Sequence, residues 1–201
     1  LARNIGALLS NGPIVLFLED DGIPAKNFVK AHLNAFKRYE ILSARGVYLP
    51  KNESNHLNAL APHYYLGDRP FPHFVNLEGN ASYDASAFFT VGGWDDQIRF
   101  GHGGPELAYR LFQYDSDYSK QIYSPDPVLY HDFADDAHHL QNKYEKQSRS
   151  LANLLSKHAD FDTFLKMWSD YYRRTDHLNL RHGQIEPDIK SRHILSKKAA
   201  S

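Results

Sequence analysis

The stretch from Ile14 to Leu18 is an uninterrupted run of five apolar residues, and three carboxylates, Glu19-Asp20-Asp21, follow it directly. A continuous apolar run of this length is typical of a strand buried on both faces, as in a parallel sheet. Such a strand delivers the acids behind it to the carboxyl edge of the sheet, where open α/β sheets bind ligands. Gly22 ends the strand, and Pro24 is well placed as the first residue of a helix.

The spacing of apolar residues predicts further elements along the chain. Short apolar runs indicate strands, and apolar positions three or four residues apart indicate helices. The predicted strands are 47–49, 73–77, 121–123 and 128–130; the predicted helices are 3–9, 24–39, 84–91, one ending near 113, one from about 135 to 155, and one from 161 to 172. Strand, acidic turn and helix at the start of the chain make half of a βαβ unit.

A long polar segment from Lys51 to Pro72 has no clean period. Loops of this length in a compact domain are usually functional or disordered. The aromatic group His63-Tyr64-Tyr65 inside it either lines an acceptor pocket or only pins the loop to the body. The segment from Arg181 onward is polar, and we expect a loosely held tail.

Composition narrows the class of protein. The 201 residues are 42% hydrophobic and 23% charged, which is ordinary for a globular chain, and the net charge of −1 argues against a nucleic-acid binder. There is no cysteine and no apolar run long enough to span a membrane, so we expect a cytoplasmic protein, with peripheral membrane association as an alternative. The chain opens inside an apparent helix without methionine, which suggests a fragment.

Three adjacent carboxylates repel one another, so at a half-buried strand end they need a compensating cation. Hard oxygen ligands on a short acidic turn suit Mg2+ or Mn2+, particularly where a diphosphate completes the coordination shell. The alternative is a solvated acidic turn that binds nothing.

Two segments together resemble the middle of a family 2 glycosyltransferase of the GT-A fold: the helix start Ala2-Arg3-Asn4-Ile5-Gly6 and the strand from Ile14 to Asp21. In that family the strand ends in an Asp-x-Asp-type metal motif, and here the first acid is Glu19. The resemblance implies that Asp21 holds a divalent ion bridging the nucleotide-sugar diphosphate. It also implies that Arg3, Asn4, Glu19 and Asp20 contact the donor or brace the metal turn.

Three later segments resemble the same family in its order. The small polar stretch from Glu78 to Ser82 corresponds to a segment facing the donor sugar, which implies a donor contact for Asn80. The group Gly92-Gly93-Trp94-Asp95-Asp96 and the segment from Phe100 to Leu111 correspond to the elements that carry the catalytic base. The family's Glu-Asp pair is absent there.

Glu106 is the only carboxylate in the second of these segments, near the amino end of a helix. A helix amino terminus favours the ionised form that a general base needs, so Glu106 is the candidate base. The alternative is that Glu106 only caps the helix, and Asp95 or Asp96 is then the fallback base.

His131 follows the strand at 128–130, where the resembling family often places a histidine as a further metal ligand. Imidazole combined with carboxylate suits Mn2+ better than Mg2+. The alternative is a polar surface histidine, one among twelve.

The resemblance implies an α/β fold with a GT-A-type, Rossmann-like mixed sheet flanked by helices, lacking the first nucleoside-binding strands. We divide the chain into a catalytic region at 1–134, a helical extension at 135–180 and a polar tail at 181–201. The aromatic face of the helix at 161–172 forms core, a partner interface or a membrane contact.

The expected function is metal-dependent transfer of a hexosyl or hexosaminyl unit from a nucleoside diphosphate sugar to a carbohydrate or other hydroxyl acceptor, with inversion. The alternative is a sugar- or nucleotide-binding or interaction module without catalysis. A metal-dependent phosphohydrolase would need more metal ligands than the sequence offers.

Overall fold

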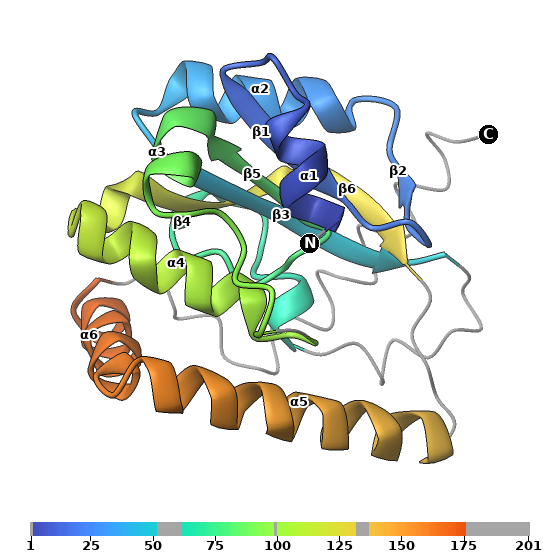
Figure 1. The fold of residues 1–201 in the computed structure, drawn as a ribbon. Coiled ribbons are helices and arrows are strands. Elements are labelled where there is room, and N and C mark those ends of the chain that lie inside the picture. Colours follow the sequence, from blue (N-terminus) through green and yellow to red (C-terminus); the bar gives the residue numbers. More distant parts are fainter. Residues whose placement is uncertain (1, 52–61, 99, 132–136, 176–201) are drawn as a thin grey trace.

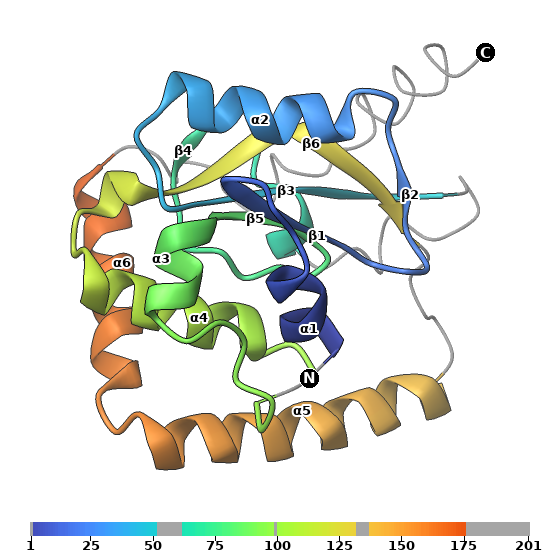
Figure 2. The same cartoon turned by 45° about the horizontal axis from the view of Figure 1, so that its top comes forward.

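The computed structural model describes residues 2–51, 62–98, 100–131 and 137–175. In this part of the chain a mixed six-stranded sheet lies between helices (Figure 1). Helix α2 covers one face, whereas α3 and α4 cover the other, and the long helix α5 lies outside α4 (Figures 1 and 2). The helices are α1 (Ala2–Leu8), α2 (Phe28–Arg38), α3 (Ala85–Thr90), α4 (Gly103–Tyr114), α5 (Ala137–Lys157) and α6 (Phe161–Arg174).

The sheet has the strand order β1-β5-β3-β6-β2, and β4 also pairs with β6. Among the described strands, β3 and β6 pair in parallel and the other pairs are antiparallel. The strands are β1 (Ile14–Leu18), β2 (Ile23–Pro24), β3 (Ser43–Pro50), β4 (Phe71–Pro72), β5 (Asn80–Asp84) and β6 (Gln121–His131). The expected α/β fold with a mixed sheet and flanking helices is therefore confirmed.

Strand β1 has the predicted bounds but a different place in the sheet. It lies at the edge and pairs antiparallel with β5, and only Val15 is fully buried. Both of its faces are nevertheless covered, since Phe17 packs against the cluster around Tyr83 and Leu16 packs against the cluster around Leu129. The apolar run correctly predicted that both faces of the strand are covered. Covered faces do not determine whether a strand has one or two neighbouring strands in the sheet.

Three other predicted elements change. Pro24 does not start α2; it belongs to β2, which pairs with residues 129–130 of β6. The predicted strand at 73–77 has alternate residues buried but is not a strand; the paired residues are 71–72, and the N–H of His73 donates to the carbonyl of Gln121 in β6. The two short strands at 121–123 and 128–130 form one strand, because β6 continues through Pro125 and Pro127 with a register shift against β3.

This register shift depends on Gly46 in the middle of β3. A Cβ atom at Gly46 would lie 2.2 Å from the carbonyl oxygen of Pro127 and 2.4 Å from Oδ1 of Asn80. Glycine lets the bulged part of β6 approach β3 closely, as is common at bulges. The bulge is what allows β6 to run on to His131, beside the end of β3.

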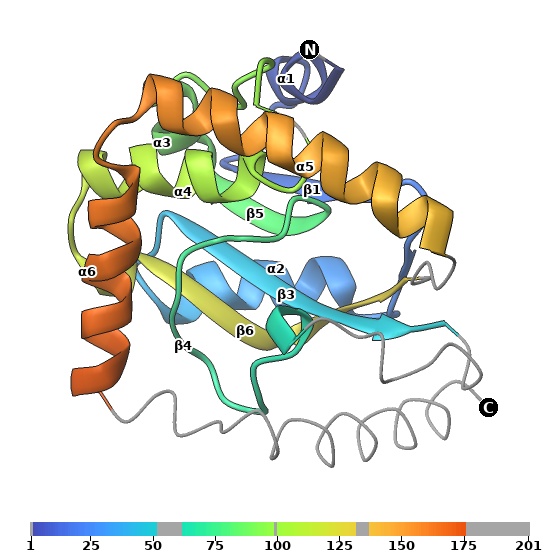
Figure 3. The same cartoon turned by 90° about the horizontal axis from the view of Figure 1, so that it is seen from below.

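The aromatic helix α6 is part of the interior. Its residues Phe161, Phe164 and Trp168 are buried in one cluster with Phe112 of α4, and Phe74 packs against them. Figure 3 shows α6 beside the end of α4. Of the three readings of its aromatic face, the structure supports core, and a membrane or partner contact through this face is not supported.

In the described ranges, no helix has both the length and the apolar character needed to cross a membrane. The predicted helix start near 135–136, the segment 52–61 and the tail at 181–201 lie outside the described residues. The proposed division into three regions stays a prediction.

Candidate functional site

Two carboxylates and a histidine come together where β1 and β6 end. Nε2 of His131 lies 3.4 Å from Oδ1 of Asp21 and 3.8 Å from Oε2 of Glu19. One ligand atom from each of the three residues lies within 4.8 Å of the others. These residues are separated by up to 112 positions in the sequence. The sheet brings them together because β2, directly after the acidic turn, pairs with residues 129–130 of β6. We call Glu19, Asp21 and His131 the acidic cluster.

Tyr48 of β3 holds the acidic cluster in place. Its hydroxyl donates a 2.6 Å hydrogen bond to Oε2 of Glu19, and its ring stacks on His131 with the centroids 5.3 Å apart. Burial, and then the negative charge of Glu19, raise the pKa of Tyr48 well above its usual range, so the phenol remains a donor. Lys51 donates to the backbone carbonyl of Asp21 and fixes the acidic turn from the other side.

The donor set of the acidic cluster fits a divalent cation. Carboxylate oxygens suit Mg2+ and Mn2+, and an imidazole nitrogen beside them favours Mn2+. The side chains of Asp21 and Glu19 are 63% and 38% exposed, so solvent or a ligand can complete a coordination shell. Glu19, expected on the donor side, lies with the two predicted metal ligands.

A cavity of about 670 Å³ opens beside the acidic cluster. Its walls come from five parts of the chain: the cluster with Tyr48, the short segment 63–64, the segment before β5, the loop before α4, and the middle of α5. The lining residues are Glu19, Tyr48, His63, Tyr64, Asn76, Leu77, Glu78, Phe100, Gly101, His102, His131, Lys146 and Gln147. A volume of this size is typical of sites that hold a small organic ligand.

The polar loop contributes two of its aromatic residues to this cavity. His63 and Tyr64 line it, whereas Tyr65 is 1% exposed and packs in the core beneath. The ring of Tyr64 lies 5.2 Å from that of Tyr48, which links the loop to the acidic cluster. Tyr65 therefore pins the loop to the body, whereas an acceptor pocket at His63 and Tyr64 stays a prediction.

Arg3 and Asn4 brace the loop that follows α3 and do not line the cavity. Asn4 forms two hydrogen bonds with the backbone of Trp94, donating to its carbonyl and accepting from its N–H. The guanidinium of Arg3 lies 4.1 Å from the centre of the Trp94 ring and donates to Oε2 of Glu78. Contact of either residue with a nucleoside stays a prediction.

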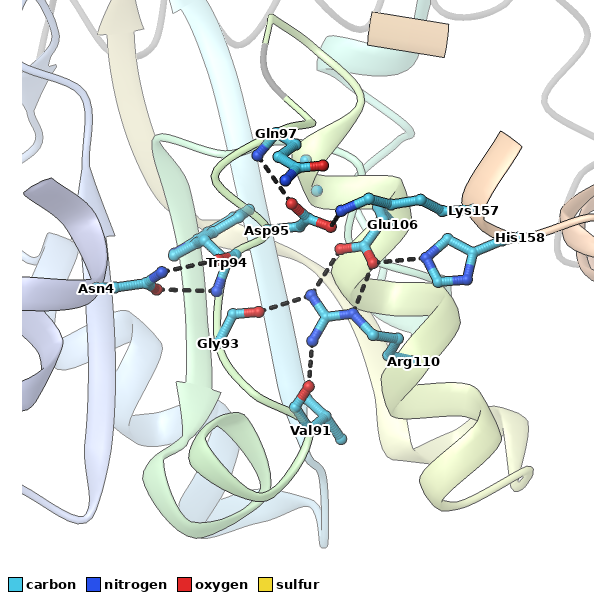
Figure 4. A network of polar contacts seen from close by, with 12 residues as sticks. Asn4, Val91, Gly93, Trp94, Asp95, Gln97, Glu106, Arg110, Lys157 and His158 are labelled. Atoms are coloured by element: carbon cyan, nitrogen blue, oxygen red, sulfur yellow. Dashed lines mark hydrogen bonds and ion pairs between the residues drawn. The ribbon is translucent and has the colours of Figure 1, made fainter. Parts of the chain in front are cut away.

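Glu106 lies in a separate polar network shown in Figure 4. Its carboxylate is 1% exposed and accepts two 2.6 Å hydrogen bonds from Arg110, one to each oxygen. Nε2 of His158 lies 2.9 Å from Oε1 of the same carboxylate. Arg110 also donates to the carbonyls of Val91 and Gly93, so the network joins α4, the loop after α3 and the end of α5.

We call Glu106, Arg110 and His158 the buried clasp. Glu106 does not line the cavity, and both of its oxygens are engaged by cationic or imidazole partners. An acceptor hydroxyl would have to displace one of them to reach the carboxylate. The role of Glu106 as base stays a prediction, and its surroundings favour a structural role.

The two fallback carboxylates also lie outside the cavity wall. Oδ2 of Asp95 pairs with Lys157 at 2.5 Å, and Oδ1 accepts from the N–H of Gln97 (Figure 4). Burial alone would raise the pKa of Asp95, but these two partners lower it overall. The adjacent Asp96 is half-buried.

The side chain of Asn80 faces the interior of the sheet. It is 0% exposed, and its amide donates to the carbonyls of Val47 and Pro127. Its Oδ1 accepts from Nε2 of His32, whose Nδ1 accepts from the Ser82 hydroxyl. These bonds use both amide hydrogens and the oxygen, and the side chain is buried, so the geometry does not support a donor contact at Asn80. Asp20 is exposed and lies outside the acidic cluster.

Two cavity residues, Glu78 and His102, were not singled out by the sequence. The chain bends at Glu78–Gly79, immediately before β5, and this bend directs Glu78 to the cavity. His102 is the residue before α4. Half-burial lowers the pKa of His102, partly opposed by the charge of Glu78, so the imidazole is neutral near pH 7. The signal available for Glu78 was its place in the small polar stretch after an extended segment.

No family model matches the chain, and no curated protein matches its sequence. Solved structures do match. PcManGT, a mannosyltransferase from Pyrobaculum calidifontis in complex with GDP-Man and Mn2+, gives a TM-score of 0.50 at 11% identity over 98% of this chain and 66% of its own. GalNAc-T7 with UDP, GalNAc and Mn2+ gives 0.49 at 15% identity over 66% of this chain and 30% of its own. The chain thus spans less than two thirds of either protein, and its fold is of the GT-A glycosyltransferase type.

Proposed function

We propose that this chain is the metal-dependent part of a glycosyltransferase that moves a hexosyl or hexosaminyl unit from a nucleoside diphosphate sugar to a hydroxyl acceptor, with inversion. The observation that carries the proposal is the acidic cluster at the wall of a ligand-sized cavity. Its support is that the fold is of the GT-A type and that PcManGT, which shares this fold, was solved with GDP-Man and Mn2+.

In this proposal Asp21 and His131 hold Mn2+ or Mg2+, and Glu19 completes the set. When bound, the ion offsets the negative charge that accumulates on the diphosphate as it leaves. Tyr48 keeps Glu19 and His131 in a fixed orientation through its hydrogen bond and its ring. Fixed positions for charged groups lower the reorganisation that the reaction requires.

The cavity walls suit the rest of the substrates. His63, Tyr64 and Phe100 present rings, and flat apolar faces beside polar groups are well suited to sugar rings. Lys146 of α5 supplies a positive charge at the cavity. We infer that donor and acceptor meet between the acidic cluster and the loop before α4.

A second candidate is a nucleotide- or sugar-binding module without catalysis. The observation in its favour is the placement of Glu106, the predicted base, in the buried clasp rather than at the cavity. Both candidates share the metal-dependent nucleotide site, so they are separated by turnover and not by binding.

The experiment is calorimetric titration of the chain with UDP and with GDP, each with and without Mn2+, on the wild type and on Asp21→Asn. We expect Mn2+-dependent binding that Asp21→Asn weakens by about 100-fold, since it removes a charged metal ligand. Glu40→Gln, at a 98% exposed carboxylate that does not line the cavity, is the matched control and should leave binding unchanged. Equal binding with and without Mn2+, or no binding by the folded chain, would contradict the proposal.

A further inference from the structure

Two carboxylates line the cavity, those of Glu19 and Glu78, among the residues that the structure describes. Glu19 belongs to the acidic cluster. Glu78 has no part in that cluster, and its side chain is 21% exposed. It is thus the cavity carboxylate that a second substrate can reach without displacing a metal ligand.

Glu78 is fixed next to the acidic turn by its neighbour Gly79. The carbonyl of Gly79 accepts a 3.0 Å hydrogen bond from the N–H of Glu19. A Cβ atom at Gly79 would lie 2.4 Å from Cβ of Glu19, so only glycine lets the two segments approach so closely. The carboxylate of Glu78 therefore has a defined place beside the metal ligands.

Its two oxygens are oriented by the start of α4 and by α1. Oε1 accepts from the N–H groups of Gly103 and Gly104 at 2.8 and 3.2 Å, and Oε2 accepts from Arg3 at 2.5 Å. A Cβ atom at Gly103 would lie 2.9 Å from Oε1, so this position also needs to be small. A carboxylate has about four acceptor sites, and these three bonds leave one on Oε2.

We propose that Glu78, and not Glu106, is the residue that accepts the proton of the attacking hydroxyl, which rests on the proposed function. The acceptor oxygen forms a bond to the anomeric carbon while the bond from that carbon to the diphosphate oxygen breaks. The electron pair leaves with the diphosphate, and the hydroxyl proton passes to Oε2 of Glu78. The hydrogen bonds from α4 and Arg3 hold the carboxylate in a fixed orientation before the reaction.

His102 is the competing proton acceptor, because its neutral imidazole lines the same cavity. Its Nδ1 is buried without a hydrogen-bond partner among the described residues. Three hydrogen bonds orient Glu78, and a base must be positioned before its basicity matters. Because Glu78 is the better positioned of the two residues, we favour it as the base, and the experiment tests both Glu78 and His102.

The test measures Mn2+-dependent release of UDP or GDP from UDP-glucose, UDP-galactose, UDP-N-acetylgalactosamine, UDP-N-acetylglucosamine and GDP-mannose, with water or azide as the acceptor. For Glu78→Gln we expect a loss of about 100-fold or more in turnover with water, because general-base catalysis is worth that much. Binding of UDP or GDP with Mn2+ should change by less than about threefold, since the metal ligands are untouched. Azide carries no proton to remove, so it should restore turnover of Glu78→Ala and give the glycosyl azide.

Gly103→Ala is a second variant that acts on the same carboxylate without removing it. Its Cβ displaces Oε1 of Glu78, so turnover should fall while nucleotide binding stays. Gly6→Ala is the matched control, because nothing lies within 4 Å of its Cβ position.

The outcomes separate this inference from the proposed function. If the wild type turns over and Glu78→Gln is equally active, the role of Glu78 is overturned and the proposed function stands. The same conclusion follows if turnover is lost only in His102→Gln. Loss of turnover without azide rescue, or together with binding, assigns Glu78 a structural role and also overturns it. Mn2+-dependent binding without turnover in the wild type favours the non-catalytic module, and no binding at all overturns both proposals.

Discussion

The acidic cluster and the buried clasp both combine carboxylate and histidine, but the clasp also contains an arginine, so they differ in charge balance. In the clasp, Arg110 neutralises Glu106 with two hydrogen bonds, and the carboxylate is 1% exposed. In the acidic cluster, two carboxylates face one histidine and lie half open to solvent. In the clasp the counter-charge is the guanidinium of Arg110, whereas the donor atoms of the acidic cluster could hold a cation from solution.

This difference explains why a carboxylate near a helix start is weak evidence for catalysis. Glu106 lies in the first turn of α4, the position from which the sequence indicated a general base. The same carboxylate also suits an i, i+4 ion pair with Arg110, and burial strengthens that pairing. The chemistry of a group depends on which partners are already bound to it.

The largest effect should come from breaking the clasp. Glu106→Gln leaves the guanidinium of Arg110 without its counter-charge, so we expect a loss of about 3 kcal/mol in the free energy of unfolding. Urea titration followed by the fluorescence of Trp94 and Trp168, the chain's two tryptophans, measures it. The double variant Glu106→Leu, Arg110→Met removes both charges and should lose less. Unchanged stability with lost turnover would restore Glu106 as the candidate base.

A third histidine extends the comparison to low pH. His32 has the neutral partners Asn80 and Ser82, whereas the histidines of the acidic cluster and the buried clasp lie beside carboxylates. Burial lowers the pKa of His32 to about 4, although its hydrogen bond with Asn80 opposes the shift. The unfolded chain therefore binds a proton below about pH 6.5 that the folded chain refuses down to about pH 4.

The stabilising contribution of neutral His32 is thus complete above about pH 6.5 and is lost as the pH falls toward 4. From pH 7 to pH 5 we expect a loss of about 2 kcal/mol from this group. The measurement is urea unfolding across this pH range. His32→Gln should reduce the slope of the free energy of unfolding against pH, whether or not the variant is itself less stable. An unchanged slope in that variant would exclude His32 as a source of the acid sensitivity.

The smallest effect should be a gain in the acidic cluster. Asp21→Asn removes one of two like charges, so without metal we expect the melting temperature to stay or to rise by an amount equivalent to about 0.5 kcal/mol. Scanning calorimetry in chelator measures it. A clear fall in stability would show that Asp21 is needed for the fold and would remove the contrast with the clasp.

The sequence was sufficient for much of the architecture. The apolar run at Ile14–Leu18, the amphipathic α2 and the aromatic α6 all formed as elements, because hydrophobic periodicity reports faces that are covered. It was less informative for β3, where Ser43 and Arg45 are buried without being apolar. Their burial follows from a central place in the sheet, which only long-range pairing determines.

The candidate site was predictable in part for the same reason. Asp21 and His131 could be paired because each follows an apolar strand and a known family places them together. Glu78 could not be separated from Asn80, two positions along the same polar stretch. The bend at Glu78–Gly79 directs the side chain of Glu78 to the cavity, whereas Asn80, the first residue of β5, points its side chain into the interior. Such a bend depends on the close approach to Glu19, which has no local signature.

The strand order also determines when this molecule can complete its fold. The central parallel pair joins Ser43 to Gln121 and Pro50 to His131, so its partners are about eighty positions apart. Closing so long a loop costs entropy before any contact compensates for it, which makes such topologies slow to form. Asp21 is near the start of the chain, and His131 comes close to it only when β6 has paired with β3. We therefore expect the acidic cluster to assemble late in folding, and a nascent chain that stops before β6 lacks His131.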